Sequence, residues 1–321
     1  MIVRPRDRGL MDDASAVAAW FLEHRERIEL ALSVHGAILF RDFAINTTAD
    51  FAAAVEIYPA PPGGYAGGAT PRRAISGRIF EATQTAANIR LMQHQEMAYL
   101  PRWPRKVAFW CNLAPETGGE TIMTSIRDFE PTIHSRLHAA VEERGLLYTR
   151  NFRSSGAFPK VLESFHRTWQ DAFYSDDPAT AEAALAEMGM ESRWEDDGSL
   201  TALYRSQGFV DHHVSGRRHW FNQLASQTFT PHSIPDEWPA YAEHYGDGRP
   251  QPYDVRFGDG GKIPLDDIVA LFPLMDAATV ALPWRHGDLL MLDNVLTAHG
   301  RNPYSGDRDV QVALLENGGV Q

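Results

Sequence analysis

The stretch His299-Gly300-Arg301-Asn302-Pro303-Tyr304-Ser305-Gly306-Asp307-Arg308 lies between two apolar segments near the end of the chain. The segments before and after it, 289–296 and 309–315, are short apolar runs of the length of buried strands. Asn, Pro, Ser, Gly and Asp fill the positions between them and favour a turn. We therefore predict two C-terminal strands joined by this turn, with His299 at the end of the first and Arg308 at the head of the second.

The same reasoning applied to the rest of the chain predicts strands and helices in mixed order. Predicted strands are 37–40, 89–100, 106–113, 121–124 and 219–221. Predicted helices are 12–34, 49–57 with Thr47-Thr48 as its cap, 131–145, 179–188 and 265–282. Pro and Gly make 59–73 a loop. We predict an α+β fold in which 1–321 forms a single domain, with a strand-built core, helices packed outside and a long insertion at about 151–247.

Composition excludes several classes of protein. Lys and Arg total 30 against 42 Asp and Glu, a net charge of -12, which disfavours binding to nucleic acid or to a membrane surface. Cys111 is the single cysteine, so a disulfide within the chain or a Cys-rich zinc site is excluded. No secretory signal or membrane-spanning run occurs. These features predict a soluble, cytoplasmic protein.

Among the 13 histidines, three lie two residues before an acid: His24/Glu26, His94/Glu96 and His286/Asp288. Residues two apart share a face on a strand but not on a helix, which sets aside the first pair. The third pair contains Gly287-Asp288, which favours a turn. His94 and Glu96 lie on a predicted strand in apolar surroundings, where a buried carboxylate needs a partner such as a metal.

His299 is the best candidate for a third ligand, contributed by a distant strand. Two histidines and one carboxylate form the facial triad of non-heme Fe(II) oxygenases, which leaves positions open for a chelating cosubstrate and for O2. The alternative is that His94 and His299 are structural histidines held by hydrogen bonds.

Arg308 favours the metal hypothesis. It shares a predicted strand face with Val310, Val312 and Leu314, and no acid on that face offers a counter-charge. A ligand carboxylate would supply one in bidentate fashion. The alternative is an arginine at a strand end that reaches solvent. Together with the histidines, Arg308 indicates iron with 2-oxoglutarate.

The sequence resembles the taurine dioxygenase/clavaminate synthase-like superfamily of Fe(II)/2-oxoglutarate enzymes, most closely its syringomycin-biosynthesis aspartyl hydroxylase-like group. The matching segments are Ala69–Arg72, His94–Tyr99, Gly118–Thr121, Trp220–Gln223, Gly287-Asp288 and His299–Arg308. The resemblance implies a double-stranded β-helix (jelly-roll) core. It implies that His94, Glu96 and His299 hold iron. It also implies that Thr121 and Arg308 bind the distal carboxylate of 2-oxoglutarate.

Substrate residues are less defined by the sequence. The sulfonate-binding arginine of taurine dioxygenases would fall at Val312, so taurine is not the expected substrate. Arg72 and Arg73 in the Gly/Pro-rich loop are candidates for a substrate carboxylate, with solvated side chains as the alternative. By resemblance, Asn222 and Gln223 would line the site. The run His212, His213, Arg217, Arg218 and His219 is predicted to lie on the surface, with a second metal site as the alternative.

We expect an oxygenase of secondary metabolism that hydroxylates or desaturates an aliphatic C–H of a small amino acid or amino-acid derivative. Succinate and CO2 would be released. Two other classes stay open: a metal-dependent hydrolase or isomerase on a cupin-like scaffold, and a non-catalytic jelly-roll binding protein. A carrier-tethered substrate and a homo-oligomer also stay open.

Overall fold

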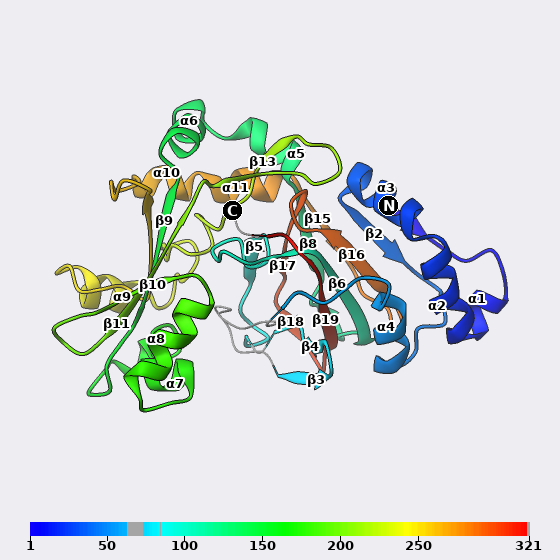
Figure 1. Cartoon of the computed structure of the whole chain (residues 1–321), viewed down its shortest axis with the longest axis horizontal. Helices are drawn as coiled ribbons and strands as arrows, with labels where there is room; N and C mark the ends of the chain where they lie inside the picture. The colour runs from blue at the N-terminus through cyan, green and yellow to red at the C-terminus, as the bar shows by residue number, and fades with distance from the viewer. Residues whose placement is uncertain (63–72, 84, 320–321) are drawn as a thin grey trace.

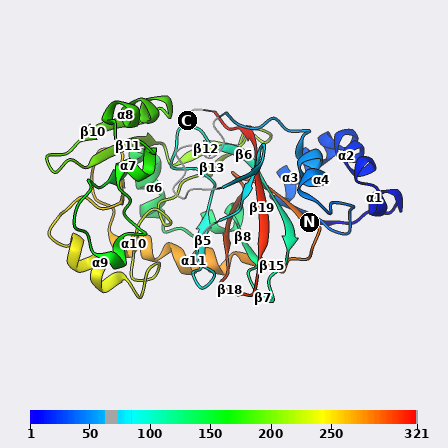
Figure 2. The same ribbon diagram turned by 90° about the horizontal axis from the view of Figure 1, so that it is seen from below.

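The computed structural model describes residues 1–62, 73–83 and 85–319. Two central sheets lie between a group of N-terminal helices and a second group of helices and strands built from the middle of the chain (Figure 1). The same three zones are seen from below in Figure 2. No helix in these ranges is long and apolar enough to cross a bilayer.

The larger central sheet has, within the described residues, the strand order β1-β2-β16-β6-β19-β4-β3. Its strands are β1 (Ile2–Val3), β2 (Ala37–Phe40), β3 (Ala74–Ser76), β4 (Ile79–Glu81), β6 (Pro104–Leu113), β16 (Leu289–Asp293) and β19 (Asp309–Asn317). Successive side chains of β6 enter different cores: Val107 and Phe109 pack in one apolar cluster, and Ala108 and Trp110 in another. Both faces of this sheet are therefore buried, as the near-continuous apolar runs predict.

The N-terminal helices cover one face of the larger sheet (Figure 1). They are α1 (Gly9–Asp12), α2 (Ala14–Glu23), α3 (Arg25–His35) and α4 (Thr48–Val55). The helix predicted over 12–34 is interrupted at His24, whose backbone leaves helical geometry. The cap predicted for α4 is confirmed, because Thr47 and Asp50 form a reciprocal capping box.

The smaller central sheet has the order β15-β8-β17-β5. Its strands are β5 (Leu91–His94), β8 (Thr121–Ser125), β15 (Thr279–Leu282) and β17 (Thr297–Arg301). The helix predicted over 265–282 is wrong at its end: α10 (Leu265–Val269) and α11 (Leu271–Ala277) are followed by β15, which pairs with β8. The strand predicted over 89–100 is limited to β5.

The middle of the chain adds a separate sheet of order β10-β11-β9-β14. Its strands are β9 (Leu146–Phe152), β10 (Glu191–Trp194), β11 (Leu200–Ser206) and β14 (Tyr253–Phe257). Around it lie η2 (Lys160–Leu162), α7 (Trp169–Phe173), α8 (Pro178–Glu187) and α9 (Trp238–Tyr245). This sheet forms the outer wall of the cavities described below.

Shorter elements complete the chain. They are β7 (Thr117–Gly118), α5 (Ile126–Phe129), η1 (Glu130–Thr132), α6 (Ser135–Arg144), β12 (Phe209–Asp211), β13 (Arg218–Trp220) and β18 (Tyr304–Ser305). The basic run at 212–219 was predicted to lie on the surface, and only part of it does. His212 is buried and bonds through Nε2 to Asp293 at 2.9 Å.

Candidate active site

Strand β5 ends at His94, and Glu96 lies in the turn that follows. The prediction that both residues share a strand face is therefore wrong. The turn is held instead by Asn294. The backbone N–H of Glu96 donates to Asn294 Oδ1 at 2.6 Å, and Asn294 Nδ2 donates back to the carbonyl of Glu96 at 2.9 Å.

His299 lies within β17 rather than at the end of the preceding strand, which stops at Asp293. In the antiparallel pairing of β17 with β5, His299 is directly opposite His94. Gly300 permits this close pairing, since a Cβ at that position would lie 2.3 Å from the carbonyl oxygen of Leu91. Two residues separated by 205 positions therefore become cross-strand neighbours.

The three side chains converge on one point. Glu96 Oε2 lies 3.4 Å from His299 Nε2 and 3.9 Å from His94 Nε2. All three candidate donor atoms lie within 4.8 Å of one another. His94 Nδ1 is 2.8 Å from the carbonyl oxygen of Met92, a contact that fixes the ring and leaves Nε2 toward the cluster.

Arg308 and Thr121 line a small cavity together with His94 and His299. Burial lowers the pKa of Arg308 to about 10, and the nearby Arg301 charge adds to this effect. Arg308 Nε donates to the carbonyl of Gly119 at 3.3 Å. Thr121 Oγ1 accepts a hydrogen bond from Trp284 Nε1 at 3.2 Å, so its own proton can be donated into the cavity.

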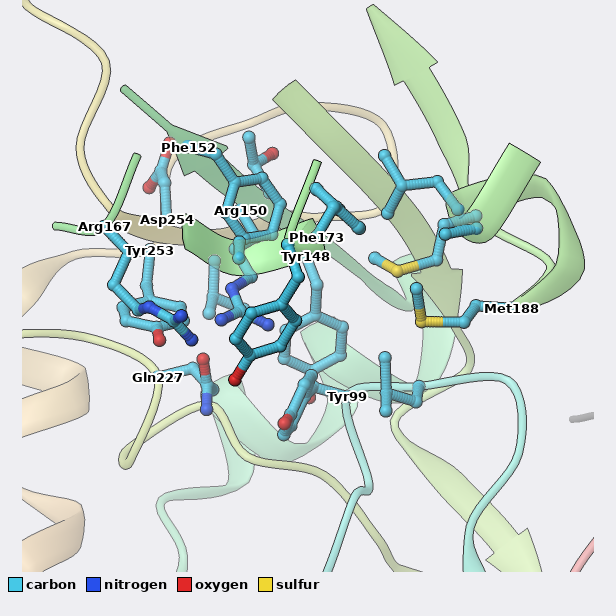
Figure 3. A pocket seen from close by; sticks show the side chains of 18 of the residues that line it. Tyr99, Tyr148, Arg150, Phe152, Arg167, Phe173, Met188, Gln227, Tyr253 and Asp254 are labelled. Carbon is cyan, nitrogen blue, oxygen red and sulfur yellow. The ribbon is translucent and has the colours of Figure 1, made fainter. Parts of the chain in front are cut away.

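A larger cavity of about 640 Å³ begins at His94 and Glu96 and extends to strands β9 and β14. A second cavity of about 440 Å³ adjoins it. Figure 3 shows the side chains of this second cavity, with Arg150 and Arg167 beside Gln227 and several tyrosines. The arrangement places a metal-type donor set at the inner end of a space large enough for a small molecule.

Comparison with known proteins now decides the family. Residues 12–314 match the model described as "Taurine catabolism dioxygenase TauD, TfdA family". The chain belongs to this TauD/TfdA family. It is accordingly a dioxygenase, and the superfamily resemblance predicted from the sequence is confirmed.

Two curated relatives align along most of the TauD/TfdA chain. A clavaminate synthase-like protein of Arabidopsis thaliana is 30% identical over 297 residues, which cover 90% of this chain and 84% of the relative. The dapdiamide synthesis protein DdaC of Enterobacter agglomerans is 28% identical over 296 residues, with coverage of 92% and 86%.

Solved structures agree on the fold. The PvcB protein of Pseudomonas aeruginosa has a TM-score of 0.52 at 14% identity, covering 98% of this chain and 85% of that one. A structure described as a putative alpha-ketoglutarate-dependent taurine dioxygenase of Burkholderia xenovorans has a TM-score of 0.52 at 14% identity, with coverage of 98% and 88%. At such identity these likenesses concern the mixed helix-and-sheet fold alone.

Two of the candidate substrate residues, Arg73 and Asn222, are in the described part of the chain, and both have partners within the protein. Arg72 is outside the described residues. Arg73 is exposed and its guanidinium pairs with Glu81 at 2.5 Å. Asn222 is buried; its side chain donates to the carbonyl of Gly208 and accepts from the N–H of Leu224, and its backbone N–H donates to Gln95 Oε1 at 3.2 Å. These bonds to backbone groups satisfy the polar atoms of its buried amide.

Two glutamines hold the turn of Glu96 in place, and sequence reasoning missed the first of them, Gln95, while Gln223 lines the larger cavity. Gln95 Nε2 donates to the carbonyls of Trp220 and Val295, at 3.1 and 2.9 Å, and thereby ties the turn of Glu96 to two distant segments. Gln223 Nε2 donates to the carbonyl of Gln95 at 2.6 Å. The sequence signal for each glutamine is its position. Gln95 is next to Glu96, and Gln223 is the last residue of the Trp220–Gln223 segment.

Proposed function

We propose that this TauD/TfdA protein is an Fe(II)- and 2-oxoglutarate-dependent oxygenase. It hydroxylates or desaturates an aliphatic C–H of a small amino acid or amino-acid-derived metabolite, and releases succinate and CO2. One observation carries the proposal: His94, Glu96 and His299 converge at the inner end of a cavity whose adjoining pocket contains Arg308.

The donor set fits iron. Two imidazoles and one carboxylate are the facial triad of non-heme Fe(II) enzymes. Adjacent ligands of an octahedral ion at bond lengths of about 2.1 Å lie roughly 3 Å apart, and the separations of 3.4 and 3.9 Å are close to this value. His299 Nδ1 is buried with no hydrogen-bond partner among the described residues, and Nε2 is the ring nitrogen that faces Glu96.

The second pocket fits the cosubstrate. Arg308 is largely buried, and the described residues that line its small cavity include no acid. A guanidinium in such surroundings favours a bidentate carboxylate. Thr121, whose oxygen already accepts from Trp284, would donate a hydrogen bond to the same carboxylate. These residues orient 2-oxoglutarate, and iron with 2-oxoglutarate supplies the activation of O2 for C–H oxidation.

The architecture around the site suits this chemistry. The larger and smaller sheets contribute His94, His299 and the strand that follows Arg308, and we propose that they form the double-stranded β-helix core implied by the sequence. Phe109 packs edge-on against His299, with ring centroids 5.1 Å apart. Apolar walls of this kind exclude water from the reacting carbon.

The substrate class is supported by the relatives' names. One relative is named for its likeness to a clavaminate synthase and the other for dapdiamide synthesis, and both names refer to the synthesis of small molecules. Val312 is fully buried in the core, so the position where taurine dioxygenases keep a second charge carries none. A cytoplasmic location completes the proposal.

A metal-dependent hydrolase would use the same three donors but would leave Arg308 without a role. The deciding experiment measures succinate formed from 2-oxoglutarate by the iron-loaded protein across free amino acids and their N-acyl derivatives. Succinate formation that requires iron and is stimulated by one of these compounds supports the oxygenase. Iron-dependent hydrolysis without consumption of 2-oxoglutarate would contradict it.

A further inference from the structure

Two cavities meet at strands β9 and β14. The cavity of about 640 Å³ reaches His94 and Glu96, and the cavity of about 440 Å³ is lined on its far side by apolar side chains, among them Leu100, Phe173, Leu185, Met188 and Met190. Six residues line both cavities, namely Tyr99, Arg150, Phe152, Arg167, Gln227 and Tyr253. We call these six the shared wall.

The shared wall is positively charged. Arg150 and Arg167 are its charged members, although the chain as a whole carries a net charge of -12. Asp254, which lines the smaller cavity, is bound by Arg256 at 2.7 Å, and the acids that line the larger cavity, Glu96 and Glu237, are not part of the shared wall. Positive side chains set between apolar walls attract an anion more strongly than they would in open solvent.

Arg150 is held in position by its strand. Tyr148, Arg150 and Phe152 alternate along β9 and therefore share one face, which lines the smaller cavity. The guanidinium carbon of Arg150 lies 4.6 Å from the ring centroid of Phe152 and 5.5 Å from that of Tyr253. Stacking on two rings orients the planar guanidinium before any ligand binds.

Arg167 is held by its backbone. The N–H of Arg153 donates to the carbonyl of Arg167 at 3.0 Å, and the N–H of Trp169 donates to the carbonyl of Arg153 at 3.2 Å. The neighbouring His166 is buried and contacts Tyr245 Oη at 2.7 Å. The guanidinium of Arg167 donates through one Nη to the carbonyl of Asp171. From this anchored segment the side chain lies beside Arg150, as Figure 3 shows.

We propose that Arg150 and Arg167 bind a carboxylate of the organic substrate, whose apolar group occupies the smaller cavity. The carbon to be oxidised then lies toward His94 and Glu96. This inference rests on the proposed oxygenase function and specifies its substrate class as an organic acid with an apolar body. It replaces Arg73 and Asn222, which both have partners within the protein.

A hydrogen-bonded chain joins the shared wall to the turn of Glu96. Gln227 Nε2 donates to Gln223 Oε1 at 3.1 Å, and Gln223 Nε2 donates to the carbonyl of Gln95 at 2.6 Å. A carboxylate on Arg150 and Arg167 also lies beside Gln227. The anion site and the metal-type donors are therefore fixed relative to each other by the protein.

The first experiment compares matched acids and amides. The probes are the N-acetyl derivatives of leucine, methionine and phenylalanine, each as free acid and as primary amide. Binding is measured by calorimetry under anaerobic conditions, in protein with Fe(II) and 2-oxoglutarate and in metal-free protein. We expect at least one acid to bind roughly tenfold to a hundredfold more tightly than its amide, the range of one charge-assisted hydrogen bond.

The second experiment assigns the preference to the arginines. Arg150→Met and Arg167→Met should each remove the preference for the acid and leave binding of the amide unchanged, while Arg150→Lys retains part of it. The matched control is Arg205→Met, since Arg205 lies exposed on the adjacent strand β11 and pairs with Glu191 at 3.1 Å.

The outcomes separate this inference from the proposed function. If no acid binds, if amides bind as well as acids, or if Arg205→Met has the same effect as Arg150→Met, the anion site is overturned. If the acid preference persists but neither iron nor 2-oxoglutarate binds, the oxygenase proposal fails and the anion site stands.

Discussion

His94 and His299 face each other across a strand pair, and neither is required to hold the sheet together. His299→Ala and His94→Ala should therefore leave the thermal midpoint almost unchanged while iron content and succinate formation fall to background. His286→Ala is the matched control, because His286 contacts the carbonyl of Asn112 at an exposed edge. Iron retention in both ligand variants, or its loss in the control alone, would show that the histidines have been misassigned.

Arg308 and Thr121 are expected to differ in their contributions to cosubstrate binding. Arg308→Lys keeps a charge but loses the planar fork, so affinity for 2-oxoglutarate should fall clearly. Thr121→Ala removes one hydrogen bond to a charged group, about 1.5–3 kcal/mol. Anaerobic calorimetry with 2-oxoglutarate gives both values. An unchanged affinity in Arg308→Lys would remove Arg308 from the cosubstrate pocket.

The pairing of β5 with β17 gives a prediction at the scale of elements. A methyl group at Gly300 would meet the carbonyl of Leu91, so Gly300→Ala should push the two strands apart and separate His94 from His299. We expect iron affinity to drop at least tenfold, with a lower thermal midpoint. Gly9→Ala is the control, because the nearest atom to its Cβ is 3.5 Å away. Unaltered iron affinity in Gly300→Ala would contradict the role given to this close pairing.

Elements with local signals were predictable from sequence. The cap of α4, the strand β2 and the alanine-rich α8 follow from residues adjacent in the chain. The last turn of the helix predicted over 265–282 was wrong because Thr279–Leu282 pairs with β8, which sequence cannot place beside it. Glu96 was assigned to a strand because the hydrogen bonds that end the strand come from Asn294, 198 residues away.

In the candidate site, too, residues in sequence motifs were predictable, and residues whose role depends on distant packing were not. His94, Glu96, His299, Thr121 and Arg308 are brought around adjoining pockets, as the motif and resemblance predicted, although their roles stay predictions. Arg150 and Arg167 were not singled out, because their proposed role in binding substrate depends on how the sheet that contains β9 and β14 faces the donor cluster. No local pattern in the sequence encodes that packing.

The whole molecule contains a buried cation that gives an acid-stability prediction. Lys106 is fully buried and lies 3.0 Å from Glu29. Burial raises the pKa of Glu29, but the hydrogen bond with His213 and the charge of Lys106 outweigh burial and lower it to about 2. A depressed carboxyl pKa stabilises the fold above the unfolded value and loses that contribution as pH falls toward 2.

Thermal midpoints between pH 6 and pH 2.5 test this contribution. Glu29→Gln should lower the midpoint at pH 6 and make its decline below about pH 4.5 shallower than in the wild type. Arg73→Gln serves as a control, since Arg73 and its partner lie at an exposed edge. A Glu29→Gln protein whose acid decline parallels that of the wild type would exclude Glu29 as a source of the pH dependence.

The central claim is that one site holds both iron and 2-oxoglutarate. The most direct measurement is an anaerobic optical titration of the protein with Fe(II) and 2-oxoglutarate together. We expect a weak visible charge-transfer band that needs both components and is lost in His299→Ala. In Arg308→Lys the midpoint of the titration should shift to a higher 2-oxoglutarate concentration. A protein that binds Fe(II) yet shows no such band at saturating 2-oxoglutarate, or a band that persists in His299→Ala, would contradict it.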